Sequence, residues 1–110
     1  MVKITPGSKI LTLINVFTVE DAEKQQALLD ALIAADEEIK RMPGYISASF
    51  HRSLDGKRVV NYTQWTSMEA IRAMQSSPQA ATHLEQVRQM VASFTPIYCE
   101  VVYSAEAASI

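Results

Sequence analysis

The sequence is poor in the residues from which metal, nucleotide and disulfide sites are built. Its 110 residues include one cysteine, two histidines and three glycines. Cys99 has no partner for an internal disulfide, and His51 and His83 lack the spacing of metal ligands. No glycine-rich loop follows an expected strand, so the usual cradle for a nucleotide is missing. We therefore expect neither a metal site nor a cofactor.

The chain also has no large excess of charge of either sign and no long apolar run. Ten basic and twelve acidic residues are interspersed, which gives a net charge of −2 and no basic stripe for a nucleic acid. No apolar run reaches the roughly 18 residues that a membrane span needs. The apolar stretch at residues 10–17 is interrupted by Asn15 and lacks a good cleavage site, so we do not expect a signal peptide. A single cysteine suits the reducing cytoplasm.

The composition is that of one folded domain. Apolar residues make up 48% and charged residues 20% of the chain. We expect a loose N-terminal arm at residues 1–8, a domain at residues 9–104 and a small polar tail at residues 105–110. A domain this small buries a modest fraction of its surface, which favours dimerisation.

Hydrophobic periodicity predicts four strands, one long helix and a second helix that is split in two. Apolar residues recur every three or four positions in two regions of the chain, as on one face of a helix. Asp21 (or Thr18) is the expected cap of the first helix and Ser67 that of the second, and Ser77-Pro78 begins a further helix. Asp55-Gly56 is a strong hairpin signal. The expected strands are 9–17, 45–53, 57–65 and 97–103, and the expected helices are 21–42, 67–75 and one from 77 that breaks at Thr95-Pro96. This order is β-α-β-β-α-β, an α+β, ferredoxin-like arrangement with an antiparallel sheet.

The hairpin also predicts which side chains share a face. With Asp55 and Gly56 as the loop, Phe50 lies opposite Asn61 and Ile46 lies opposite Trp65. One face, expected under the helices, then carries Ile46, Ala48, Phe50, Val59, Asn61, Thr63 and Trp65. The other face carries Tyr45, Ser47, Ser49, His51, Val60, Tyr62 and Gln64, and its aromatic content predicts a second subunit as its cover.

Asn61 and Trp65 are the polar members of the face expected to be buried. A buried amide and a buried indole N–H must find partners in protein, water or a ligand. Asn61 could instead tie down a bulge, and Trp65 could simply anchor the core. The residues alone leave these alternatives open.

Residues 43–67 carry a family signature. The segment PGYISASFHRSLDGKRVVNYTQWTS resembles the core of the antibiotic biosynthesis monooxygenase family, with its P-G turn, D-G hairpin and strand ending in N-Y-x-x-W. It is similar to the small anthrone oxygenases of aromatic polyketide pathways. The resemblance implies ferredoxin-like protomers that pair through their sheets as a dimeric α+β barrel. It also implies oxidation of a phenolic or quinone-forming substrate by O₂, without metal, flavin or haem.

The resemblance further assigns site residues. In the anthrone oxygenases an Asn and a Trp at the positions of Asn61 and Trp65 contact the substrate oxygens, which makes these two the expected catalytic residues. A family Tyr is replaced by Ile71, and a family Arg falls near Leu84, with Arg88 one turn further on. These departures leave the substrate open. The expected substrate-binding residues are Phe50, Thr63, Ile71, Arg72, Met74, His83, Leu84 and Arg88.

The expected chemistry needs few protein groups. Triplet O₂ reacts slowly with closed-shell molecules, so the protein must favour an electron-rich substrate anion and exclude water. Donors such as the Asn61 amide and the Trp65 indole would stabilise the developing oxyanion. The general base is left open among His51, His83, Arg72 and water.

Two other functions fit the same sequence. One is a non-catalytic dimer that binds a small molecule without the reaction. The other is a haem-degrading relative of the same superfamily, in which Asn15 and His83 would stand at the haem-contacting positions. In that reading Met74 replaces the Trp that distorts the haem.

Overall fold

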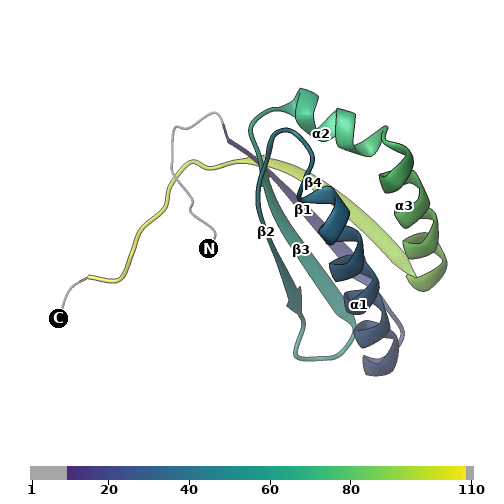
Figure 1. Ribbon diagram of the computed structural model, residues 1–110. Helices are drawn as coiled ribbons and strands as arrows, with labels where there is room; N and C mark the ends of the chain where they lie inside the picture. Colours follow the sequence, from purple (N-terminus) through teal and green to yellow (C-terminus); the bar gives the residue numbers. More distant parts are fainter. Residues whose placement is uncertain (1–9, 109–110) are drawn as a thin grey trace.

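The chain folds into a four-stranded antiparallel sheet whose one face is covered by three helices (Figure 1). The computed structural model describes residues 10–108. The elements are β1 (Leu11–Thr18), α1 (Ala22–Ile39), β2 (Tyr45–Arg52), β3 (Arg58–Trp65), α2 (Met68–Gln75), α3 (Pro78–Met90) and β4 (Ser93–Glu100). The strand order across the sheet is β2-β3-β1-β4. The predicted ferredoxin-like α+β fold is confirmed, with its second helix split in two.

The helices begin where the sequence places their caps. The side chains of Asp21, Ser67 and Ser77 each accept a hydrogen bond from the backbone N–H three residues later, at 2.9, 3.1 and 3.2 Å. Such caps contribute about 1 kcal/mol each, and Pro78 at the start of α3 is already set to the helical φ. Helix α1 ends at Ile39, earlier than the expected Met42.

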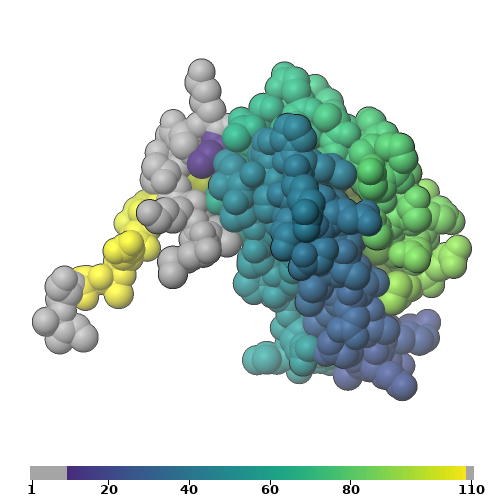
Figure 2. All heavy atoms as spheres, viewed as in Figure 1, coloured from purple at the N-terminus to yellow at the C-terminus, as the bar shows by residue number. Residues whose placement is uncertain are grey.

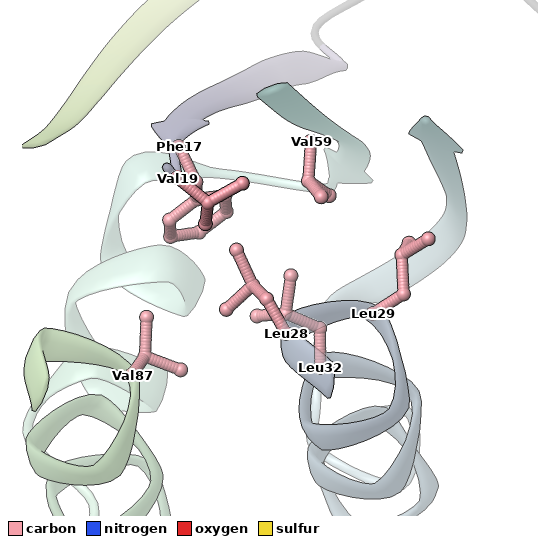
Figure 3. Close-up of a cluster of buried hydrophobic side chains, with 7 residues drawn as sticks. All are labelled: Phe17, Val19, Leu28, Leu29, Leu32, Val59 and Val87. Carbon is pink, nitrogen blue, oxygen red and sulfur yellow. The ribbon is translucent and has the colours of Figure 1, made fainter. Parts of the chain in front are cut away.

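The core lies between the sheet and the helices in two clusters. Leu28 and Val59 have no exposed surface, and Phe17 stacks on Phe94 with ring centroids 5.0 Å apart. The larger cluster consists of Phe17, Val19, Leu28, Leu29, Leu32, Val59 and Val87 (Figure 3). The smaller consists of Leu13, Trp65 and Ile71. The predicted apolar spacing of α1 therefore does face the sheet.

A β-bulge makes the register differ from the predicted one at the end of the hairpin away from the turn. Phe50 does pair with Asn61, but the register shifts between Tyr45 and Ser47, so that Tyr45 and not Ile46 pairs with Trp65. An extra residue in one strand turns every later side chain to the opposite face. Tyr45 consequently lies on the helix-covered face, and Ile46 is 42% exposed.

The last strand lies earlier than predicted. It spans Ser93–Glu100 and contains Pro96, whereas the sequence pattern predicts a strand over 97–103 that follows a break at Thr95-Pro96. Strand β4 is an edge strand, and proline is tolerated there because one side of the backbone needs no ladder hydrogen bond. Pro96 thus belongs to the sheet and pairs with Asn15.

The space-filling view shows how the helices lie over the sheet. In Figure 2 the blue atoms of α1 lie beside the green atoms of α2 and α3, and the yellow residues beyond β4 extend away from this body. Residues 105–108 of the expected tail are exposed and have no regular secondary structure. The expected arm at residues 1–8 and the last two residues of the tail lie outside the described residues. No helix within residues 10–108 is long and apolar enough to cross a membrane.

Candidate active site

A cavity of about 260 Å³ lies between the sheet and the helices. Members of both core clusters line it, so it separates the two halves of the core. Its floor is the helix-covered face of the sheet, and its roof comes from α1, α2 and α3. The residues that line it are Leu13, Asn15, Phe17, Leu32, Ala35, Asp36, Ile39, Phe50, Asn61, Thr63, Trp65, Met74, Gln75, Ala80, His83, Leu84, Val87, Phe94, Pro96 and Tyr98.

Two asparagines face each other across the middle of the floor. Asn15 of β1 and Asn61 of β3 are register partners, with Phe50 beyond Asn61 and Pro96 beyond Asn15. Partners in neighbouring strands hold their Cβ atoms about 5 Å apart. The sheet thus presents two amides side by side, flanked by apolar rings.

Neither amide oxygen is satisfied within the described part of the chain. The Oδ1 atoms of Asn15 and Asn61 are both buried and have no hydrogen-bond partner there. An unsatisfied buried polar atom costs about 1–3 kcal/mol, which a structure retains only where something else compensates. Each amide can donate and accept, so the pair suits a ligand with adjacent hydroxyl and carbonyl oxygens.

Trp65 lines the cavity but does not offer its N–H to it. The indole Nε1 donates to Oγ1 of Thr63 at 3.0 Å, and Thr63 in turn donates to the carbonyl oxygen of Leu13 at 3.2 Å. Trp65 is only 1% exposed. The expectation that this N–H is free for a ligand is therefore corrected: it is taken up by a hydroxyl two residues away on the same face of β3. Trp65 instead supplies an immobile aromatic wall.

A carboxylate occupies the roof. Asp36 of α1 is half-buried and accepts the hydroxyl of Tyr45 at 2.9 Å on Oδ1 and 3.1 Å on Oδ2. Partial burial raises the pKa of Asp36, and the hydrogen bond from Tyr45 opposes that rise. The Tyr45 hydroxyl has its own pKa raised by burial and by the neighbouring carboxylate, so it stays a donor.

His83 is the second titratable group of the roof. Its Nε2 lies 3.1 Å from Oε2 of Glu38, and the Glu38 side chain is 57% exposed. This pair reaches from the cavity to the surface of the protein. The other histidine, His51, lies on the opposite face of the sheet beside Ser49, away from the cavity.

The structure brings most of the predicted site residues together. Asn61, Trp65, Phe50, Thr63, Met74, His83 and Leu84 all line the cavity. The other three are not among the residues that line it. Ile71 is completely buried against Leu13 and Trp65, and Arg72 and Arg88 are exposed on the solvent side of α2 and α3.

Asn15, Asp36 and Tyr45 are site features that the expected set of site residues did not include. Asn15 interrupts an apolar strand and, in the haem-degrading alternative, stands at a haem-contacting position; its pairing with Asn61 explains the interruption. Asp36 is one acid among several on α1, and a register counted from the hairpin turn predicts Tyr45 on the opposite face of the sheet. Only the bulge, which no sequence rule located, brings them together.

Comparison with known proteins identifies relatives across the whole domain. The model of the antibiotic biosynthesis monooxygenase family matches residues 10–86. Tetracenomycin-F1 monooxygenase of Streptomyces glaucescens is 44% identical over 110 residues, which cover 99% of this chain and 96% of that protein.

Solved structures share the fold. A monooxygenase from ActVA-Orf6 of Streptomyces coelicolor, in complex with nanaomycin D, superposes with a TM-score of 0.82 at 26% identity, covering 89% of this chain and 92% of that one. A mutant of SnoaB of Streptomyces nogalater, described as a cofactor-independent oxygenase, superposes with a TM-score of 0.80 at 19% identity, covering 88% and 97%. The second likeness bears on the fold alone.

Proposed function

The chain belongs to the antibiotic biosynthesis monooxygenase family, and on this premise we propose that it is a cofactor-independent monooxygenase. Its substrate would be a phenolic, quinone-forming aromatic compound of the polyketide kind, in the manner of the relative named for tetracenomycin F1. One observation carries the proposal: two facing amides with unsatisfied oxygens lie in an otherwise mostly apolar cavity.

The reaction needs no external reductant. A phenol with a hydrogen on the opposite ring carbon reacts with O₂ to give a quinone and one molecule of water, so the substrate supplies all the electrons. The protein must bind the substrate, favour its anion and exclude water. The Nδ2–H groups of Asn15 and Asn61 would donate hydrogen bonds to the oxygen on which negative charge develops, and their amide oxygens would accept from a neighbouring hydroxyl of the substrate. The rings of Phe50 and Trp65 would hold the aromatic plane.

Two alternatives predict different results. A binding protein without catalysis would take up the same compounds and leave O₂ unchanged. A haem-degrading enzyme would need His83 as an iron ligand, but its Nε2 is engaged with Glu38. We expect haem titration to produce no Soret band.

We propose oxygen consumption by metal-stripped protein as the test. Anthrones, naphthols and hydroquinones should be offered in turn, with the Asn61→Ala/Trp65→Phe double variant as the control. Uptake by the parent protein that the double variant loses is the expected result. Binding without uptake across the panel would overturn the oxygenase in favour of the non-catalytic alternative.

We further propose that the protein is a homodimer paired through the open face of the sheet. That face carries apolar side chains of three adjacent strands, and Ile97 among them is 43% exposed. They are Ile14, Val16, Val60, Tyr62 and Ile97. An exposed apolar patch of this kind favours pairing with a second copy of the chain. Analytical ultracentrifugation should therefore give twice the mass of one chain. A monomer at micromolar concentration would contradict the proposal.

The remaining assignments are also proposals. The domain would span residues 9–104, between an N-terminal arm and a short tail. The protein would work in the cytoplasm, where the lone Cys99 stays reduced.

A further inference from the structure

The carboxylate of Asp36 lies across the cavity from the paired amides. It comes from α1 in the roof, whereas Asn15 and Asn61 come from the sheet in the floor. Within residues 10–108 it is the only carboxylate among the residues that line the cavity. A substrate that fills the space is therefore held between hydrogen-bonding amides and one basic oxygen pair.

Tyr45 fixes this carboxylate in place. Its hydroxyl lies 2.9 and 3.1 Å from the two oxygens of Asp36, and its ring meets Trp65 edge to face with centroids 5.3 Å apart. Tyr45 reaches Asp36 because the bulge in β2 turns it onto the helix-covered face. Bulges often re-aim a side chain beside an active site. One donor leaves the remaining lone pairs of the carboxylate available to a ligand.

The surroundings suit a base. Partial burial raises the pKa of Asp36, while Tyr45 and Lys40 lower it and Glu37 raises it. The other titratable groups that face the cavity are His83 on α3 and Tyr98 on β4. His83 is paired with Glu38, and the hydroxyl of Tyr98 accepts a hydrogen bond from Gln75 at 2.9 Å. Asp36 is thus a half-buried acceptor with a fixed orientation.

We propose that Asp36 is the general base of the oxygenation and that Tyr45 is its positioning residue, an inference that rests on the proposed function. In the keto form of the phenol, Asp36 takes a proton from the ring carbon opposite the oxygen that the amides hold. The C–H bond breaks, and its electron pair leaves that oxygen as a phenolate held by the amides. The opposite ring carbon then forms a C–O bond with O₂, which is reduced to the level of a peroxide while the ring is oxidised.

The same proton completes the reaction. Protonated Asp36 returns it to the outer peroxide oxygen, which gives a hydroperoxide. The hydrogen on the same carbon then leaves as a proton, the O–O bond breaks, and water departs with the outer oxygen. The products are the quinone and one water, and Asp36 ends ionised as it began. The overall reaction consumes only the substrate and O₂.

Asp36→Asn tests the base directly. The amide keeps the shape but cannot accept the proton, so we expect kcat to fall by about 10²- to 10⁴-fold with little change in substrate affinity. Formate or acetate should restore part of the activity to Asp36→Ala, which a purely structural role would not allow. Asp30→Asn is the matched control, because Asp30 is exposed on the same helix and should leave kcat unchanged.

Tyr45→Phe tests the positioning role through the pH profile. The base must be ionised, so activity is lost as the pH falls through the pKa of Asp36. The Tyr45 hydrogen bond lowers that pKa, so its removal should move the acidic limb to higher pH while the ring stays against Trp65. An unmoved limb in Tyr45→Phe would contradict the positioning role.

The outcomes separate this inference from the function it rests on. If the parent protein consumes O₂ and Asp36→Asn does so equally well, Asp36 is not the base and the oxygenase proposal stands. If His83→Gln alone abolishes turnover, the base is His83 and the inference is overturned. If the parent protein binds the compounds without consuming O₂, both proposals fall together.

Discussion

Replacing Asn61 with alanine should lower kcat by about 10²- to 10³-fold, as expected for a lost donor to a developing oxyanion. The amide oxygen has no partner within the described residues, so truncation removes little stabilising interaction from the protein itself. The free energy of unfolding should therefore change by less than about 1 kcal/mol. Steady-state oxygen uptake and urea denaturation measure the two effects on the same preparation.

The pairing with Asn15 supplies the control. Because the two residues are register partners, Asn15→Ala should also lower kcat, and the double variant should lose less than the product of the single effects. Asn61→Ala that is strongly destabilised yet turns over normally when folded would identify Asn61 as a structural residue. The bulge-tying interpretation of Asn61 would then be correct.

Gly44→Ala should destabilise the protein by about 3 kcal/mol. Gly44 has a φ of +87°, where a side chain costs about 1–2 kcal/mol. A Cβ built there would lie 2.3 Å from the Cβ of Ala70 in α2, so the turn and the helix would have to separate. Such overpacking adds about 1–3 kcal/mol. Urea denaturation of the variant measures the loss.

Gly56 provides the matched comparison. It has a φ of +78°, but a Cβ there would lie 3.2 Å from the nearest atom, the Cβ of Ala22. Gly56→Ala should therefore cost about 1–2 kcal/mol from the backbone alone. Comparing Gly44→Ala/Ala70→Gly with Ala70→Gly isolates the contact with the helix. Equal losses at Gly44 and Gly56 would show that this contact is unimportant.

Local signals were enough to predict the order of helices and strands along the chain. The caps at Asp21, Ser67 and Ser77 and the Asp55-Gly56 turn depend on residues close together in sequence, and all four are present in the structure. The last strand was misplaced because Pro96 looks like a break unless its place at the sheet edge is known. Strand order is a long-range property, and no local pattern contains it.

Counting residues from the turn predicts the site only on the hairpin strands; Met74, His83 and Leu84 of the helices, which also line the cavity, came from the family resemblance. Phe50 and Asn61 were placed by counting from the turn, and that register is correct until the bulge. Beyond it, Tyr45 and Ile46 exchange faces, so the link from Tyr45 to Asp36 could not be anticipated. Whether a helical Arg points to the cavity depends on the rotation of α2 and α3 about their own axes relative to the sheet, which the sequence does not give; Arg72 and Arg88 are exposed.

The most direct measurement of the central claim is the fate of ¹⁸O₂ in a turnover by metal-stripped, flavin-free protein. The site would transfer one oxygen atom to the bound aromatic ring and release the other as water. We predict one ¹⁸O atom in each molecule of quinone and one in water, with Asn61→Ala forming the same products far more slowly. Product oxygen that comes from H₂¹⁸O instead, or turnover that requires added metal or flavin, would contradict a cofactor-independent monooxygenase.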